Sequence, residues 1–259
     1  MSTIILKLWG TLSKEKSDSI NYKIAETLLQ NINSFDDTSS ESLAKLCNVS
    51  KASISRFSKD VGYKDFYDFR MDLSTIIHNY SKTEIYRGKR SLGISQIYFD
   101  NCINNIKQLS ENIDELEIEK IARILFRTEH VFLLGNMQSG NVAENLQYNL
   151  FLLNKMTTSI TNVSEQKNLL RNLKGDELVI IFSASGTFFY DYFEEKCIPK
   201  IPNGVNIYLV TSNPEINNLG NIKILNAKTG LDISALGLSI QIISDLIYLK
   251  YESYINNHT

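Results

Sequence analysis

The sequence predicts a mixed α + α/β fold, in which an all-helical domain with a helix-turn-helix precedes a doubly wound domain with a parallel five-stranded sheet. Apolar residues recur at helical spacing through the first 79 residues, whereas short continuous apolar runs alternate with helical segments from His130 onward. The length of 259 residues also favours two domains, because single cores stop growing beyond about 250 residues. We expect a helical domain at 1–79, a linker at 80–95 and a sheet domain at 96–259.

The composition limits the possible partners and chemistry. The net charge is −2 at pH 7, so any binding to nucleic acid must be local rather than a property of the whole chain. Cys47, Cys102 and Cys197 are far apart and lack the spacing of metal ligands, which predicts reduced thiols and no metal. No stretch resembles a signal peptide or a membrane span. These features predict a cytoplasmic protein with no cofactor and no membrane partner.

Helical periodicity predicts five helices in the N-terminal domain. The first helix has apolar residues at Ile4, Ile5, Leu8 and Leu12. The second follows the capping residues 17–19 and continues to Ile32. Two short helices fill 40–62, and the segment 64–79, with aromatic and aliphatic residues on one face, forms the fifth.

The stretch 40–62 has the pattern of a DNA-reading helix-turn-helix, with a tight corner at 47–49. Thr38 and Glu41 are the expected capping box of its first helix. Ser50 is the expected N-cap of its second helix, which Gly62 can end in a left-handed conformation. The residues expected on the inner face are Leu43, Ala44, Leu46, Ile54, Phe57 and Val61.

The outward face of the second short helix is cationic, since no carboxylate occurs from Ser42 to Lys59. The small Ala52 would let this helix enter a major groove deeply, and Arg56 can fork onto guanine O6 and N7. Phosphates would be held by Lys51, Ser53 and Lys59. The expected DNA-contacting residues are Ser50, Lys51, Ala52, Ser53, Ser55, Arg56 and Lys59. The alternative is an ordinary helical pair with a solvated polar face.

Five apolar runs in the second half of the chain are candidate strands, centred near Leu133, Ile160, Ile180, Leu209 and Ile224. Helices are expected at 96–112, 116–127, 140–154, 165–173, 188–196 and 233–255. This alternation predicts a parallel sheet with helices on both faces. Ligands of such sheets bind beyond the carboxyl ends of the strands, at the topological switch point.

Two of the predicted strands end in hydroxyl-bearing loops. Residues 136–140, Asn-Met-Gln-Ser-Gly, follow the first strand, and 183–187, Ser-Ala-Ser-Gly-Thr, follow the third. Hydroxyl and backbone N–H groups at a helix N-terminus form an uncharged cradle that suits a phosphate. Either loop alone favours simple helix capping, whereas the two loops on one sheet leave capping and a phosphorylated ligand equally open.

The run LAKLCNVSKASISRFSKDVGYKDFYDFR, followed by a sheet domain with a strand ending in SASGT, resembles the RpiR family of bacterial transcriptional regulators. The resemblance covers nearly the whole chain and implies a DNA-binding domain joined to a sugar isomerase (SIS) domain that senses phosphosugars. It implies that Ser139, Ser183, Ser185, Gly186 and Thr187 bind the ligand. Gly135 also fits the SIS pattern, but Met137 replaces a glycine and Phe188 replaces a threonine, with Thr187 one residue early.

Three functions follow from this pattern. The first is a regulator of carbohydrate metabolism that binds a palindromic operator in double-stranded DNA as a homodimer or higher homo-oligomer and responds to a phosphosugar effector. The candidate partner surfaces are the closing helix and the helices flanking the linker. The second is a regulator whose sheet domain is only a dimerisation scaffold, an alternative that Met137 and Phe188 leave open. The third is a phosphosugar isomerase.

The isomerase hypothesis finds little support in the sequence, and we expect no catalytic residue and no enzyme activity. Aldose–ketose interconversion needs a positioned base, usually Glu or His. Glu144 is the only conspicuous candidate, because His78, His130 and His258 do not fall where a strand end would present them.

Overall fold

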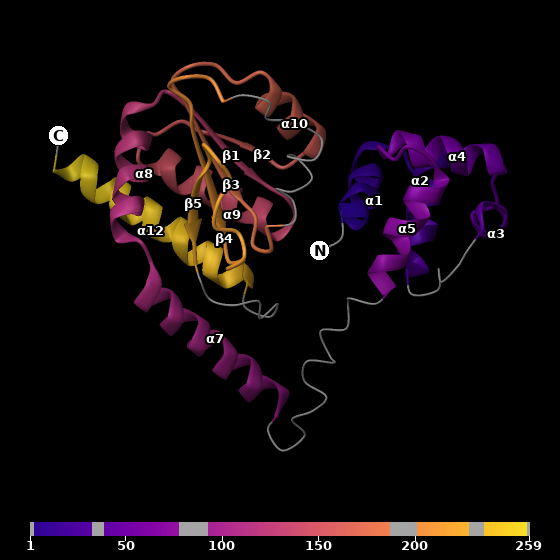
Figure 1. The fold of residues 1–259 in the computed structure, drawn as a ribbon, viewed down its shortest axis with the longest axis horizontal. Coiled ribbons are helices and arrows are strands. Elements are labelled where there is room, and N and C mark those ends of the chain that lie inside the picture. Colours follow the sequence, from indigo (N-terminus) through magenta and orange to yellow (C-terminus); the bar gives the residue numbers. More distant parts are fainter. Residues whose placement is uncertain (1–2, 33–38, 78–92, 187–200, 228–235, 258–259) are drawn as a thin grey trace. The chain divides into compact units, whose positions relative to one another are not determined.

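The computed structural model describes residues 3–32, 39–77, 93–186, 201–227 and 236–257. The chain divides into two compact units, Met1–Ser81 and Lys82–Thr259, referred to below as the N-terminal unit and the C-terminal unit (Figure 1). Most of the expected linker, and the expected helix at 188–196, lie outside the described residues.

The described part of the N-terminal unit is helical, as the sequence predicts. Its helices are α1 (Thr3–Lys14), α2 (Ile20–Gln30), α3 (Ser40–Leu46), α4 (Lys51–Asp60) and α5 (Phe66–Ile77). Each helix turns most of its apolar positions inward because they recur at spacings of three and four residues. Leu46 of α3, expected on the inner face, is instead 49% exposed. The resulting core includes Ile4, Leu8, Ile24, Leu28, Leu43, Ile54, Phe57, Phe69 and Leu73.

An aromatic cluster fixes α4 against α5. The rings of Phe57 and Phe69 meet edge to face with centroids 5.9 Å apart, and Tyr63 packs on Phe69 at 5.4 Å. Such pairs contribute about 0.5–1.5 kcal/mol beyond the area they bury. The outward face of α4 is therefore presented on a rigid support.

The caps of the helix-turn-helix follow the prediction except at α3. Ser39, rather than Thr38, is the N-cap of α3, because the Ser39 hydroxyl accepts from the N–H of Ser42 at 3.1 Å. Thr38 itself lies outside the described residues. Ser50 caps α4 as expected, and Gly62 has a φ of +87° just beyond the end of that helix.

The C-terminal unit is built on a five-stranded sheet in the order β2-β1-β3-β4-β5, in which every neighbouring pair is parallel. The strands are β1 (His130–Gly135), β2 (Thr158–Ile160), β3 (Glu177–Phe182), β4 (Asn206–Thr211) and β5 (Lys223–Asn226). All five predicted strand centres fall within these strands. The chain moves outward from β1 to β2 and then returns to place β3 on the other side of β1. The topological switch point therefore lies between β1 and β3.

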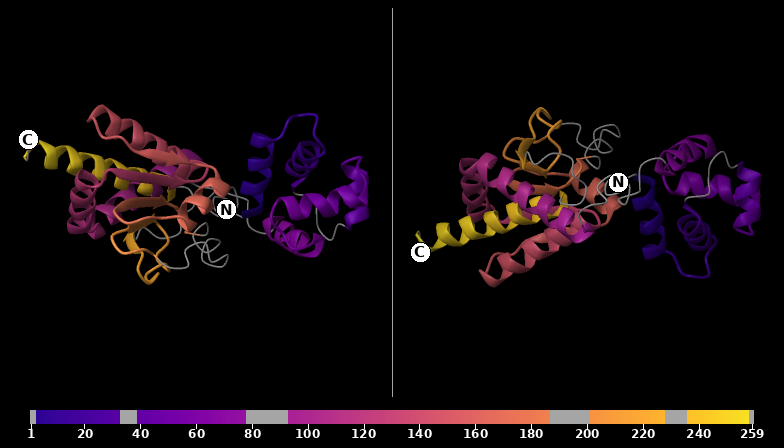
Figure 2. Two further views of the ribbon diagram at one scale, coloured as in Figure 1. Left: turned by 90° about the horizontal axis from the view of Figure 1, so that it is seen from above. Right: turned by 90° about the horizontal axis from the view of Figure 1, so that it is seen from below.

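Five described helices belong to the C-terminal unit, and several of them pack against the sheet. They are α7 (Ile94–Asn112), α8 (Glu115–Arg127), α9 (Gln138–Leu152), α10 (Val163–Arg171) and α12 (Leu236–Asn256). The long α12, drawn in yellow, lies alongside α8 and α9 (Figures 1 and 2). The helices α7, α9 and α10 each begin two residues before the predicted position, which is within the fraying expected of helix ends.

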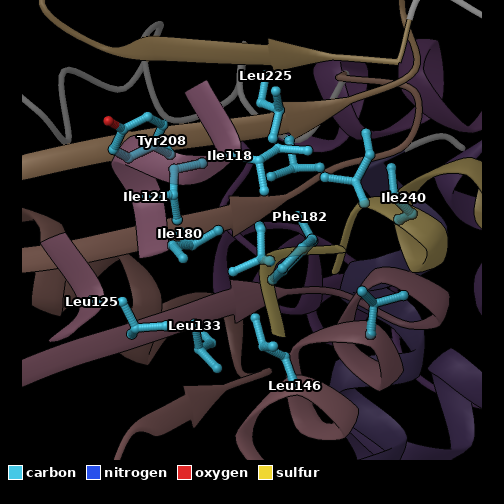
Figure 3. Packing of buried hydrophobic residues seen from close by; sticks show 14 of the residues in the cluster. Ile118, Ile121, Leu125, Leu133, Leu146, Ile180, Phe182, Tyr208, Leu225 and Ile240 are labelled. Carbon is cyan, nitrogen blue, oxygen red and sulfur yellow. The ribbon is translucent and has the colours of Figure 1, made fainter. Parts of the chain in front are cut away.

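Alternate residues of the central strands form one apolar core with α8, α9 and α12. Figure 3 shows Ile180 and Tyr208 of the strands near Ile121 of α8, and Leu133 beside Leu125, all within the same buried cluster. Every residue of β3 is buried, including those that point to the opposite face. A strand buried on both faces needs a continuous apolar run, which is the pattern of Glu177–Phe182 after its first residue.

Candidate DNA-contacting helix and ligand-binding edge

The outward face of α4 combines exposure with positive charge. Lys51, Ala52, Arg56 and Lys59 are exposed, and Ser55 is half-buried. Within the part of the chain that the structure describes, neither Lys51 nor Arg56 has an ion-pair partner. These side chains are therefore available to a polyanion.

Two serines of the predicted DNA-contacting set, Ser50 and Ser53, meet at the N-terminus of α4, where Ser50 is the cap. Ser53 is only 6% exposed, its N–H donates to the Ser50 hydroxyl at 3.1 Å, and the two hydroxyl oxygens are 2.9 Å apart. The expected outward position of Ser53 as a phosphate contact is therefore wrong. Ser53 lies one helical turn before the buried Phe57, so its side chain faces the core, and its backbone N–H is one of those at the start of the helix that need a capping partner. Ser50 is exposed and caps the helix, so it remains available to a phosphate.

At the carboxyl edge of β1, the loop into α9 depends on a close backbone approach. A Cβ at Gly135 would lie 2.3 Å from the carbonyl oxygen of Ser139, a distance that no side chain tolerates. Met137 has φ 51° and ψ −118°, a conformation that favours glycine, and its side chain is 41% exposed. The loop thus keeps a glycine-like backbone in spite of the methionine, and Ser139 follows it in the first turn of α9.

The buried side-chain amide of Gln166, in α10, holds the start of this loop. Its Nε2 donates to the carbonyl oxygen of Gly135 at 3.0 Å and also to that of Ile160, so it joins β1, β2 and α10. The sequence did not reveal this residue, because a glutamine in an amphipathic helix is usually exposed. Its only signal was its helical spacing with Leu170.

At the carboxyl edge of β3, residues 183–186 form a tight turn in which the N–H of Gly186 donates to the carbonyl oxygen of Ser183 at 3.0 Å. Ser183 is buried and Ser185 is half-buried. Gly186 has φ +72°, and a Cβ there would lie 1.9 Å from Cδ1 of Ile216. Thr187 and Phe188, the next two residues of interest, lie outside the described residues.

The two loops leave β1 and β3, the neighbouring strands on either side of the switch point. The register pairs Gly135 with Phe182, so the chain enters both loops at the same level. Residues 135–140 and 183–186 contain no charged side chain, so their polar groups are the serine hydroxyls, the side-chain amides of Asn136 and Gln138, and the backbone. The described residues contain no group of three or more His, Cys, Asp or Glu that can hold a metal ion.

The groups considered for isomerase chemistry lie elsewhere. His130 begins β1 and is therefore at the opposite end of the sheet from the loops. Glu144 is exposed on α9, where it lines a shallow hollow with Tyr148 and Phe151. His78 and His258 lie outside the described residues. The described residues thus place neither His130 nor the carboxylate considered for catalysis beside Ser139 or Ser183.

Two further observations bear on the class of protein. Burial raises the pKa of the Cys47 thiol in the corner of the helix-turn-helix, which keeps it protonated and unreactive. No helix in the described ranges combines the length and the apolar content that crossing a bilayer requires. The N-terminal unit has the architecture of a helix-turn-helix domain, and the outward face of its second short helix, α4, is cationic.

The family model described as the helix-turn-helix domain of the rpiR family matches residues 12–80. The chain therefore carries an RpiR-family helix-turn-helix domain. It is 27% identical over 198 residues to an uncharacterised HTH-type transcriptional regulator from the aarA 3' region of Providencia stuartii, a stretch that covers 72% of this chain and 67% of that one. It is 25% identical over 180 residues to the uncharacterised HTH-type regulator YbbH of Bacillus subtilis, covering 67% of this chain and 62% of YbbH.

Among solved structures, the chain is similar to the NanR protein of Vibrio vulnificus, which was solved in complex with ManNAc-6P. The sequence identity is 16%, the TM-score is 0.48, and the match covers 98% of this chain and 93% of NanR. The regulators of Providencia stuartii and Bacillus subtilis extend well beyond the stretches that they share with this chain.

Proposed function

We propose that the chain is a transcriptional regulator of carbohydrate metabolism that binds a palindromic operator in duplex DNA through α4 and senses a phosphorylated sugar at the carboxyl edge of its SIS-type sheet. The observation that carries the proposal is the exposed outward face of α4, where Lys51, Arg56 and Lys59 outnumber the single carboxylate at the last residue, Asp60, within an RpiR-family helix-turn-helix domain. Such a face matches the major groove in shape and the phosphate backbone in charge.

In this proposal the residues of α4 divide into two roles. Ala52 has no side chain beyond Cβ, so the start of the helix can approach the base edges closely. Arg56 lies one turn further along the same face, where its guanidinium can read a guanine. Ser50, Lys51, Ser55 and Lys59 contact phosphates and sugars, which sets the register of the helix on the duplex.

The proposed effector is a sugar phosphate held by the hydroxyl groups of Ser139, Ser183 and Ser185, with Gly186 and Thr187 completing the loop. The glycine-like backbone at Met137 supports this, because a side chain held in an unfavourable backbone conformation costs about 1–3 kcal/mol and tends to persist at functional sites. The ligand would favour one arrangement of the two reading helices over another and so alter operator binding.

A thermal-shift panel on the full chain tests the sensing role. The panel contains hexose 6-phosphates, pentose 5-phosphates and N-acetylhexosamine 6-phosphates, and we expect one of these classes to raise the melting temperature. A ligand concentration of one hundred times the dissociation constant stabilises the folded chain by about 2.7 kcal/mol. Ser185→Ala should weaken that shift, whereas Ser110→Ala, which removes an exposed hydroxyl on α7, should not. If no sugar phosphate shifts a chain that binds DNA normally, the sheet domain is a dimerisation scaffold only.

The proposed regulator works as a pair, since helix-turn-helix proteins usually bind two half-sites. The closing helix α12 buries Ile240, Ile243 and Ile247 within its own unit, so that apolar face is not available to a partner. The outward face of α9 is unusual for a helix on a sheet, because Tyr148, Phe151 and Leu152 are between 57% and 63% exposed. We expect a second copy of the chain to bind over this face.

Sedimentation velocity at several concentrations tests this surface. Phe151→Glu should shift the chain toward the monomer, whereas Leu116→Glu, at an apolar position of α8 that is 70% exposed, should leave the dimer intact. A dimer that tolerates Phe151→Glu would place the partner surface elsewhere, with the exposed apolar residues of α7 as the next candidate.

A further inference from the structure

The polar segment at the end of β4 underlies the Ser183–Gly186 turn. Thr211 and Ser212 are fully buried and Asn213 is 8% exposed, although all three are polar. Buried polar side chains are retained where they make hydrogen bonds that the fold or a site requires. The partners of Asn213 therefore indicate what this segment does.

Two carbonyls of the turn are held from β4 and the residues that follow it. The carbonyl oxygen of Ala184 accepts from the N–H of Ser212 at 3.0 Å and from the hydroxyl of Thr211 at 3.3 Å. The carbonyl oxygen of Ser185 accepts from Nδ2 of Asn213 at 2.9 Å. This last bond is made by a side-chain amide, and it engages the peptide that joins Ser185 to Gly186.

The Asn213 side chain is itself fixed in orientation. Its Oδ1 accepts from the N–H of Glu215 at 3.0 Å, and a backbone N–H can only donate, so Oδ1 must face Glu215 and Nδ2 must face the Ser185 carbonyl. The backbone carbonyl of Asn213 in turn accepts from Nδ2 of Asn226 on β5. A network that crosses β4 and β5 thus ends on the Ser185–Gly186 peptide.

This contact has an electrostatic consequence for an anion at the turn. A carbonyl oxygen that faced a phosphate would repel it, whereas the Ser185 carbonyl is held on the buried side by Asn213. The N–H of the same peptide donates to Ser183 and closes the turn. Both ends of the peptide are therefore constrained, and with them the backbone that carries the Ser185 hydroxyl.

We propose that Asn213 is a positioning residue for anion binding at the Ser183–Gly186 turn: its amide holds the Ser185 carbonyl away from the ligand and fixes the Ser185 hydroxyl in place. This inference rests on the proposed sugar-phosphate site. It adds a residue from the end of β4 to a site otherwise built on the ends of β1 and β3. Asn213 acts through the turn and does not itself contact the ligand.

The test uses Asn213→Asp in the full chain, with inorganic phosphate, arabinose 5-phosphate, glucose 6-phosphate and N-acetylmannosamine 6-phosphate as probes. Aspartate keeps an acceptor for Glu215 but presents a second oxygen to the Ser185 carbonyl in place of a donor. The matched control is Asn218→Asp, which makes the same charge change at a side chain that accepts from the N–H of Gly220 and lies in an exposed turn. At pH 7.5 we expect Asn213→Asp to weaken the affinity for the tightest-binding probe at least tenfold. Asn218→Asp should change that affinity less than twofold.

A pH series separates positioning from a general loss of stability. When the carboxyl group that Asn213→Asp introduces is protonated, it regains a donor for the Ser185 carbonyl, so the affinity deficit relative to wild type should narrow as the pH falls from about 7.5 toward about 5. The comparison is made with wild type at each pH, because the phosphate group itself titrates near about pH 6. Hydrogen exchange of the Gly186 amide in the ligand-free chain should be faster in Asn213→Asp and unchanged in Asn218→Asp.

The outcomes distinguish the two proposals. If wild type binds none of the probes, the sugar-phosphate site fails and the role of Asn213 fails with it. If wild type binds a probe and Asn213→Asp lowers the melting temperature but leaves the dissociation constant unchanged, the site stands and the positioning role is overturned. Should Asn213→Asp not fold, Asn213→Ser replaces it, since serine can accept from Glu215 but is too short to reach the Ser185 carbonyl; an unchanged affinity there also overturns the inference.

Discussion

The substitution Gly186→Ala probes the turn at the end of β3, and its cost can be worked out from two features of the structure. Residue 186 has φ +72°, and an L side chain in this left-handed region costs about 1–2 kcal/mol. The new Cβ would also lie 1.9 Å from Cδ1 of the buried Ile216, and overpacking of this kind costs about 1–3 kcal/mol. The expected loss of unfolding free energy is therefore about 2–5 kcal/mol.

Gly220→Ala separates the two contributions. Gly220 has φ +63°, and nothing lies within 4 Å of the position of its added Cβ. It should therefore show the backbone cost alone, about 1–2 kcal/mol. Ile216→Val provides the complementary control, because it removes the Cδ1 atom that clashes. Gly186→Ala should cost less in the Ile216→Val background than in wild type.

Urea denaturation followed by far-ultraviolet circular dichroism reports the helices of both units, and the transition that belongs to the C-terminal unit is the one that Trp9 fluorescence does not show. Trp9 is the only tryptophan of the chain and lies in α1, so its fluorescence reports the N-terminal unit separately. The Trp9 transition should not move in any of these variants. If Gly186→Ala cost no more than Gly220→Ala, and cost the same with and without Ile216→Val, the close contact inferred at the turn would be wrong.

Two further predictions concern a helix cap in the N-terminal unit and a buried phenol in the C-terminal unit. Ser50→Ala removes the acceptor of the Ser53 N–H and should lower the stability of the N-terminal unit by about 1 kcal/mol, measured from the Trp9 urea transition; an unchanged midpoint would contradict the capping role. Burial and the Glu117 carboxylate raise the pKa of the Tyr208 phenol. Above about pH 10 the unfolded chain therefore loses this proton before the folded chain does, and the unfolding free energy falls as the pH rises. Tyr208→Phe should lower the unfolding free energy by about 1–3 kcal/mol at neutral pH, and this difference from wild type should narrow above about pH 10. A difference that stays constant with pH would contradict the raised pKa of the Tyr208 phenol.

Local patterns in the sequence were sufficient for most of the architecture. The strand centres at Leu133, Ile180 and Leu209 are correct because a strand buried on both faces requires a continuous apolar run. The exposed face of α4 is correct because helical spacing separates Ala52 and Arg56 from Ile54 and Phe57.

The positions that the sequence missed depend on capping geometry or on contacts between distant segments. Ser53 is polar and lies near the cationic face, but it precedes the buried Phe57 by one turn, so its side chain faces the core and its hydroxyl meets that of Ser50. Gln166 and Asn213 are polar residues whose burial follows from the packing of other elements against them. A single sequence does not contain those long-range contacts.

DNA binding by α4 is the central claim, and fluorescence anisotropy with a duplex selected from a random pool tests it most directly. Wild type should bind the selected duplex. Arg56→Ala should weaken it about 5- to 150-fold and relax the preference at one base position of each half-site. Lys51→Ala should weaken all duplexes alike and lower the salt slope by about one per bound copy, while Lys107→Ala, on α7, should change neither quantity. An operator affinity that is unchanged by Arg56→Ala, or a wild-type chain that binds no duplex at low salt, would contradict the assignment of α4 as the reading helix.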